Sequence, residues 1–359
     1  MSTMDTSCDI VIVGAGSAGC TLAARLSEDP NLKVTLIEAG TPSKYPWLSI
    51  PIGYFKTVGN PAHDWQFETE PEAGMADRRL PWPRGKGPGG SSLINGMLYL
   101  RGHQQDYDRW QALGNPGWSW ADVLPYFRKA EHNERLSDDW HGQNGPLNVA
   151  ELQSPNVFSK RFVEAGVQAG WAHNPDFNGA RQDGVGLYQV THKNGERWSA
   201  AKGYLTPHRH RSNLTVITQA HTHKVLLDSS HGDPRATGVQ YEHKGKMHEL
   251  RARREVLVSS GAFGSPQLLM LSGIGPAEHL RHHGIPVRHA LPGVGQNLQD
   301  HITTVLIYRT QHQRETLGFY LSGHPIESYR EMIDQICSGR MGELIRQYAQ
   351  QSFFDFLIP

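Results

Sequence analysis

The fold is decided by Ile10-Val-Ile-Val-Gly-Ala-Gly-Ser-Ala-Gly19, an apolar run that leads directly into three spaced glycines. The apolar run predicts a buried strand, and the residues after the glycines predict a helix. Gly14 allows the tight turn, Gly16 lets a pyrophosphate approach the backbone, and Gly19 lets the helix pack closely on the strand. A second apolar run at 34–37 predicts the neighbouring strand. The stretch therefore predicts a βαβ unit of an α/β fold.

The turn and the end of the second strand supply groups suited to a dinucleotide. The N-terminus of the predicted helix offers free N–H groups and the positive end of its dipole to phosphates. Glu38 follows the second strand, where a carboxylate can accept hydrogen bonds from an adenosine ribose and disfavours a 2′-phosphate. We therefore expect FAD or NAD, and not NADP. The candidate cofactor-binding residues of this first arm are Gly14, Gly16, Ser17, Ala18, Gly19 and Glu38.

A second glycine-rich stretch, Arg84-Gly-Lys-Gly-Pro-Gly-Gly-Ser-Ser-Leu-Ile-Asn-Gly96, follows some 45 residues after Glu38. Its closely spaced glycines leave backbone amides open to a second part of a large cofactor. The alternative is a mobile linker. The apolar residues that bracket the stretch and the lack of Ser/Gly repetition argue against it.

Three stretches of the chain resemble the glucose–methanol–choline (GMC) oxidoreductases, FAD enzymes that oxidise alcohols. Residues 84–96 are similar to the first signature of that family, 261–275 to its second, and 293–301 to a further conserved stretch. The resemblance spans about Cys8 to Tyr308 and is closest to bacterial FAD-dependent alcohol dehydrogenases and choline dehydrogenase. It implies a Rossmann-like FAD-binding domain with an incomplete α+β substrate domain.

The resemblance also implies roles for individual residues. Some family members attach the flavin covalently through a histidine of the second glycine stretch, and the matching position here is Ile94. We therefore expect FAD to be bound without a covalent bond. The further cofactor-binding residues that the resemblance implies are Gly89, Gly90, Ser91, Asn95 and Gly96 along the pyrophosphate and flavin, Val225 on the adenine side, and Gly261.

The 359 residues exceed the roughly 250–300 at which a single core usually stops growing, so more than one domain is expected. The sequence predicts an irregular covering loop at 47–83. Helices are predicted at 106–111, 120–131, 157–170 and from Ser265-Pro266, and further strands at 214–220 and 256–261. The expected domains are a first FAD-binding part with the covering loop (1–155), a substrate-domain portion (156–212), a second FAD-binding part (213–309) and an atypical tail (310–359).

Oxidation of an alcohol by a flavin needs a base for the hydroxyl proton while hydride leaves for flavin N5. The resemblance implies a histidine in a His-Pro motif, well downstream of the stretch that ends at His301. His324-Pro325 has the dipeptide, but it lies only 23 residues after His301 and lacks the glycine-rich context expected after it. His301 is a weak substitute. The catalytic residue is therefore unknown, and we expect little or no turnover from the chain as it stands.

Residues 314–329 resemble a segment of the bacterial DNA polymerase III alpha subunit that lies away from its catalytic carboxylates. The expectation is a truncated chain joined near Thr310 to foreign sequence, without polymerase activity. The leading hypothesis is an FAD-dependent dehydrogenase of an aliphatic or choline-like alcohol. The alternatives are a catalytically dead FAD-binding fragment, an NAD-dependent Rossmann enzyme and a replication-associated binding module.

Charge and composition limit the classes of binding partner and the compartment that we expect for this chain. The 35 basic and 35 acidic residues cancel, which gives no electrostatic footprint for nucleic acid. The 20 histidines lack the spacing of a zinc site, so no metal is expected. Three distant cysteines, no signal peptide and no long apolar stretch predict a cytoplasmic protein, with peripheral attachment to the inner membrane left open. The expected partners are an alcohol substrate and an electron acceptor such as a quinone.

Overall fold

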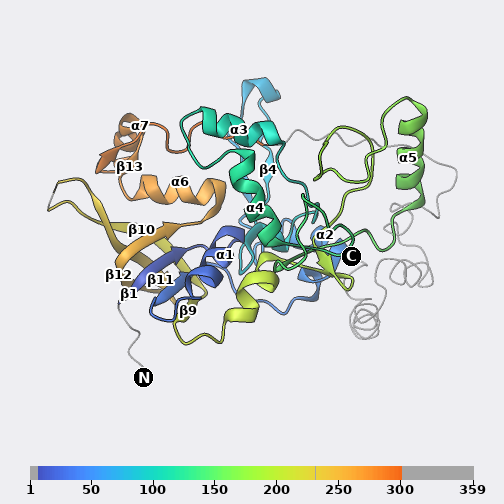
Figure 1. The fold of residues 1–359 in the computed structure, drawn as a ribbon. Coiled ribbons are helices and arrows are strands. Elements are labelled where there is room, and N and C mark those ends of the chain that lie inside the picture. The colour runs from blue at the N-terminus through green and yellow to red at the C-terminus, as the bar shows by residue number, and fades with distance from the viewer. Residues whose placement is uncertain (1–6, 231, 301–359) are drawn as a thin grey trace, which may run out of the picture. The chain divides into compact units, whose positions relative to one another are not determined.

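The structure is a computed structural model that describes residues 7–230 and 232–300. Figure 1 draws these residues in colour by residue number. They divide into a first unit, made of 7–45, 55–94 and 199–300, and a second unit, made of 46–54 and 95–198. The expected first domain ran continuously from 1 to 155. In the structure 95–155 groups instead with the residues that follow it, because these segments contact one another more than they contact the nucleotide sheet.

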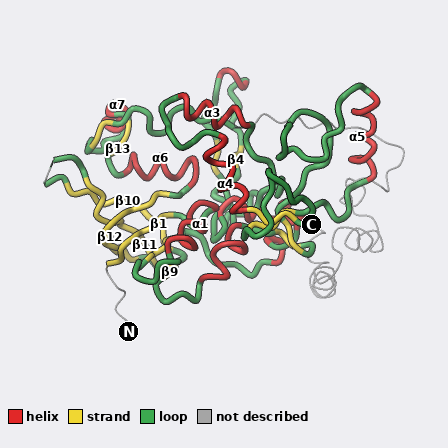
Figure 2. Tube along the Cα trace, viewed as in Figure 1, coloured by secondary structure: helices red, strands yellow, loops and turns green. Residues whose placement is uncertain are grey.

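A six-stranded sheet organises the first unit, in the order β10-β11-β12-β1-β2-β9. Strands β12, β1, β2 and β9 run parallel, and β10, β11 and β12 form an antiparallel meander. Figure 2 shows these strands in yellow, gathered on one side of the view. Their bounds are β1 Ser7–Val13, β2 Val34–Ile37, β9 Leu214–Ile217, β10 Ala220–Asp228, β11 Arg235–His243 and β12 Lys246–Val258.

Strand β1 is buried on both faces, as expected of a central parallel strand. Ile12 packs in one core cluster with Ala23 of helix α1 (Ser17–Leu26). Val11 packs in the other cluster with Leu268 of helix α6 (Gly261–Leu271). The two helices therefore cover opposite faces of the sheet, and the predicted βαβ unit is confirmed.

Three predicted boundaries are wrong. The strand predicted at 256–261 ends at Val258, where β12 ends. The run 214–220 is not one strand, because Gln219 adopts φ 55° and separates β9 from β10. Helix α6 begins at Gly261 and not at Ser265-Pro266. The Ser260 N–H donates to Ser265 Oγ at 3.0 Å, which closes a first turn before the proline. Pro266 therefore lies inside the helix, where it removes one backbone donor and its ring crowds the carbonyl group four residues earlier.

The predicted helices of the second unit are confirmed within a few residues. Ser119 caps α4 in a capping box, since its Oγ accepts from the Asp122 N–H at 3.2 Å and the Asp122 carboxylate accepts from the Ser119 N–H. The covering-loop segment contains only short elements. The remaining elements are α2 Tyr54–Thr57, β3 Phe67–Glu68, β4 Pro81–Trp82, α3 Gln104–Ala112, α4 Trp120–Ala130, β5 Glu131–Asn133, β6 Leu147–Val149, α5 Val157–Gln168, β7 His192–Lys193, β8 Glu196–Arg197, β13 Ile274–Gly275, α7 Ala277–His282 and β14 His289–Ala290.

A buried ion network forms the polar core of the second unit. Glu131 accepts from Arg101 at 2.6 Å and lies 3.0 Å from His141 Nδ1, while His141 Nε2 lies 3.1 Å from Asp176. The side chains of Arg101, Glu131 and His141 are at most 2% exposed. Burial alone would lower the pKa of His141, but the hydrogen bonds to Asp176 and Glu131 outweigh it and raise the pKa to about 9. His141 is therefore a cation held between two carboxylates.

The second unit should lose stability as the pH rises from neutral to about 9. His141 binds its proton more tightly in the folded chain, with a pKa of about 9 against an ordinary 6.5. The stabilisation from its charge is complete below pH 6.5 and is lost as the pH rises through the folded pKa. Urea unfolding followed by tryptophan fluorescence at several pH values measures the slope of the unfolding free energy against pH. The slope should become shallower in His141→Gln, and an unchanged slope would rule out His141 as its source.

Candidate functional site

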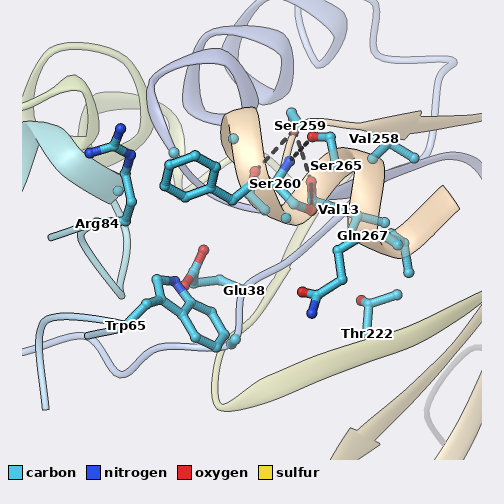
Figure 3. A pocket seen from close by; sticks show the side chains of 18 of the residues that line it. Val13, Glu38, Trp65, Arg84, Thr222, Val258, Ser259, Ser260, Ser265 and Gln267 are labelled. Carbon is cyan, nitrogen blue, oxygen red and sulfur yellow. Dashed lines mark hydrogen bonds between the residues drawn. The ribbon is translucent and has the colours of Figure 1, made fainter. Parts of the chain in front are cut away.

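A cavity of about 840 Å³ opens in the first unit at the carboxyl ends of β1 and β2, where α/β sheets bind their ligands (Figure 3). Residues from β1, β2, β10 and the starts of α1 and α6 line it, together with residues 84–85 and 90–91 of the second glycine stretch. Both glycine-rich arms of the sequence therefore face one cavity.

The two glycine turns contact each other. The Gly89 N–H donates to the Ala15 carbonyl oxygen at 2.7 Å. A Cβ on Gly90, whose φ is +54°, would lie 2.7 Å from the Gly16 Cα, closer than real Cβ contacts. A side chain at Gly90 would thus push the turns apart, so this close approach needs glycine.

Helix α1 presents an uncapped N-terminus to the cavity. Gly16 precedes the helix without a side-chain cap, and Ser17 and Ala18 of the first turn line the cavity. The first N–H groups of a helix have no intrahelical acceptor, so they can bind an anion. Gly19 lies beneath the turn, where a Cβ would meet the Gly14 carbonyl oxygen at 1.8 Å. The sequence thus builds a cradle of backbone donors that suits a pyrophosphate.

Glu38 lies at the end of β2 and is 6% exposed. Its Oε2 accepts from the Ala15 N–H at 2.8 Å and its Oε1 from the Gly40 N–H at 2.7 Å. Burial raises the pKa of Glu38, and the hydrogen bonds from Gly40 and Ala15 act against that rise. The carboxylate has more lone pairs than its backbone donors occupy, so Glu38 can also accept a hydrogen bond from a ligand hydroxyl in the cavity.

Aromatic rings and cations form another side of the cavity. The Arg84 guanidinium lies 4.6 Å from the Phe263 ring centroid and 3.6 Å from Asp300. The Lys86 ammonium lies 4.8 Å from the centroid of Trp65, which lines the cavity and belongs to the predicted covering loop. In Figure 3 Trp65 and Glu38 lie near each other in the view, with Arg84 farther out. These cations add positive charge near a site built for phosphates.

The structure brings together most of the predicted site residues, but not all. Gly19 and Gly89 support the turns from below, and Asn95 and Gly96 belong to the second unit and do not line the cavity. The predicted residues that line the cavity are Gly14, Gly16, Ser17, Ala18, Glu38, Gly90, Ser91 and Gly261.

Val225 is placed differently from its predicted role on the adenine side. Its side chain is 4% exposed in the core, and its N–H donates to Ser272 Oγ at 2.8 Å, so that backbone donor is engaged. Thr222 of the same strand lines the cavity instead. The pairing of β10 with β11 shifts register between Thr222 and Lys224, and this irregularity breaks the simple alternation from which the face of a strand is inferred.

Sequence reasoning missed several of the residues that line the cavity, and Thr222, Ser259 and Gln267 are among them. Ser259 lies two residues before the second signature stretch, 261–275, and Gln267 lies within it. That stretch is the sequence feature from which both could have been predicted. Within 7–230 and 232–300 no group of His, Cys, Asp or Glu is arranged to hold a metal ion, and no helix there is long and apolar enough to cross a membrane.

Comparisons with known proteins agree with this geometry. A family model described as GMC oxidoreductase matches residues 8–303. The chain is 46% identical over 302 residues to an alcohol dehydrogenase [acceptor] of Pseudomonas putida, covering 83% of this chain and 54% of that protein. It is 46% identical over 294 residues to an oxygen-dependent choline dehydrogenase of Sinorhizobium fredii, covering 82% of this chain and 53% of the relative.

Solved structures show the same fold. Pyridoxine 4-oxidase from Mesorbium loti has a TM-score of 0.74 at 35% identity, covering 79% of this chain and 55% of the other. A formate oxidase has a TM-score of 0.79 at 27% identity, covering 95% of this chain and 60% of the other. The chain spans about half the length of the curated relatives it matches. The predictions on His301, on His324-Pro325 and on the polymerase-like segment 314–329 lie outside the described residues.

Proposed function

The chain belongs to the GMC oxidoreductase family, and from that premise we propose that its first unit binds one FAD through both glycine turns. The observation that carries the proposal is the contact between the turns at a single cavity, with Gly90 against Gly16 and Glu38 on the lining. A close turn that a Cβ on Gly14, Gly19 or Gly90 would disrupt, next to an uncapped helix N-terminus, fits the pyrophosphate of a dinucleotide.

We assign each part of FAD to residues that line the cavity. The first turn of α1 binds the pyrophosphate, Glu38 accepts from the adenosine ribose, and Gly90 with Ser91 lies on the path toward the flavin. The roles of Asn95 and Gly96 at the flavin rest on the family resemblance alone. Ile94 offers no nucleophile where some family members carry a histidine, so the FAD is held without a covalent bond.

We propose that the protein oxidises the CH–OH group of an aliphatic or choline-like alcohol. The names of the relatives from Pseudomonas putida and Sinorhizobium fredii support this substrate class. Bound FAD would supply the hydride acceptor at its N5 atom, while this chain holds and orients it. The proposed electron acceptor is a quinone or a similar compound, in a cytoplasmic protein that attaches peripherally to the inner membrane. None of the described residues is assigned as the catalytic base.

The test is a titration of the purified chain with FAD, followed by flavin absorption and fluorescence. We expect saturable binding of one FAD per chain, release of all flavin on denaturation, and no comparable binding of NAD. Binding of NAD with no binding of FAD would favour the NAD-dependent alternative. Absence of binding to either cofactor would overturn the proposal.

A further inference from the structure

The loop between α3 and α4 of the second unit is an exposed apolar surface with no role in holding the cofactor. Every residue from 110 to 118 is exposed. Three large apolar side chains lie there, since Trp110 is 46% exposed, Leu113 70% and Trp118 51%. The ring centroids of Trp110 and Trp118 are 5.7 Å apart. Leu113 follows Trp110 by three residues, so the two lie on the same side of α3. We call these three residues the tryptophan tip.

The fold holds the tryptophan tip in place. The Asn115 carboxamide donates to the Trp110 carbonyl oxygen at 2.9 Å, which ties the loop back to α3. Asp108 of α3 accepts from the N–H of Trp120, the first residue of α4, at 2.9 Å. The buried Tyr107 ring lies 5.4 Å from the Trp110 ring and 5.6 Å from the Trp120 ring, between centroids. The two helices therefore form a fixed base beneath the tip.

The tryptophan tip carries no charge, since none of the residues 110–118 is acidic or basic. The nearest acids in the sequence, Asp108 and Asp122, accept hydrogen bonds from backbone N–H groups at the start of α4. Arg109 is the exposed cation beside the tip. Nucleic acids are bound through charge, so they do not match this surface. The interfacial zone of a lipid bilayer does match it, because tryptophan rings lie at headgroup level there and apolar side chains reach the acyl boundary.

The size of the tip favours a lipid surface over a protein partner or a second copy of the chain. Two half-exposed tryptophans and one leucine present roughly 350 Å² in all, if a whole aromatic side chain presents up to about 250 Å². A specific protein interface buries about 800 Å² on each partner. A bilayer surface needs no such area, since each inserted side chain passes separately from water to the lipid boundary.

We propose that the tryptophan tip is the surface by which the protein attaches peripherally to a lipid bilayer, with its three side chains in the headgroup region. The inference rests on the proposed function, which includes peripheral attachment and names no surface for it. Because the tip is uncharged, it should bind bilayers that contain no anionic lipid, and salt should have little effect on that binding.

The experiment measures binding of the full 359-residue chain to phosphatidylcholine vesicles by co-sedimentation. The unchanged protein should bind, and its affinity should change by less than about twofold between low and high salt. Leu113→Asp places a charge at the most exposed side chain of the tip and should weaken binding about tenfold. Trp110→Ser combined with Trp118→Ser should weaken it at least as much. The control is Trp171→Ser, at an exposed tryptophan of the same unit outside the tip, which should bind as the unchanged protein does.

Tryptophan fluorescence gives an independent reading of the same surface. Phosphatidylcholine brominated on its acyl chains quenches tryptophans that reach the acyl boundary. It should quench the unchanged protein and Trp171→Ser, and should leave the double variant of Trp110 and Trp118 unquenched. Thermal melts check that each variant folds. Leu113→Asp keeps both rings, so it tests the tip even if the double variant does not fold.

The outcomes separate this inference from the proposed function. If the unchanged protein and the tip variants bind vesicles equally, the tip is not the attachment surface, while peripheral attachment still stands. If binding requires phosphatidylglycerol and is lost at high salt, the inference is likewise wrong. If the tip variants change the oligomeric state in analytical ultracentrifugation and leave vesicle binding unchanged, a second copy covers the tip and the inference is wrong. If the unchanged protein binds no vesicle, the proposed attachment fails first and this inference falls with it, while the FAD titration tests the cofactor proposal separately.

Discussion

Replacing Gly90 with alanine should weaken FAD binding about 100-fold or more, which corresponds to about 2.7 kcal/mol. Gly90 has φ +54°, a conformation that costs a residue with a side chain about 1 kcal/mol or more. The added Cβ would also lie 2.7 Å from the Gly16 Cα. The second glycine stretch must therefore move away from the phosphate turn, and the single cavity is lost. Flavin fluorescence titration measures the effect.

The matched control for this variant is Gly74→Ala. Gly74 lies in the same unit, has no positive φ, and a Cβ there would meet nothing within 4 Å. The control should bind FAD as the unchanged protein does. If Gly90→Ala also binds FAD within about threefold of the unchanged protein, the two turns do not need their close approach to hold the cofactor.

Replacing Glu131 with alanine should lower the free energy of unfolding of the second unit by about 3–5 kcal/mol. Glu131 is fully buried and bonds to both Arg101 and His141. Its removal leaves Arg101 without its buried carboxylate and leaves His141 with Asp176 alone. Urea unfolding followed by tryptophan fluorescence measures the loss.

The control is Glu164→Ala, on the exposed surface of α5 in the same unit. Its effect should stay within about 0.5 kcal/mol. A loss below about 1 kcal/mol for Glu131→Ala would mean that the ion network adds no more than a typical exposed pair. In that case the pH dependence assigned to His141 would also need another source.

How much of the structure can be predicted from the sequence differs from one part of the molecule to another. The first arm, from Ile10 to Glu38, was readable because a βαβ unit is local and each of its steps has its own residue signal. The contact between Gly16 and Gly90 joins residues 74 positions apart, so their spacing could only suggest it. The family resemblance indicated that both glycine stretches bind the same cofactor, and the structure shows the contact between them.

The parts that the sequence did not reveal depend on tertiary structure. The network of Arg101, Glu131, His141 and Asp176 draws on segments with no shared motif, and none of these residues stood out beforehand. Thr222 was missed because a register shift in β10 hides which side chains face the cavity. The start of α6 was misplaced because the Ser265 hydroxyl, and not Pro266, completes its first turn. Irregular pairing and local side-chain bonds are weakly encoded in hydrophobic patterns.

The most direct test of the central claim is a crystal structure of the chain grown with FAD. We predict one FAD in the cavity of the first unit, with its pyrophosphate within hydrogen-bonding distance of the backbone N–H groups at Ser17 and Ala18 and with Gly90 in contact with the same molecule. A flavin bound outside this cavity, or touched by one glycine stretch while the other lies apart, would contradict the account.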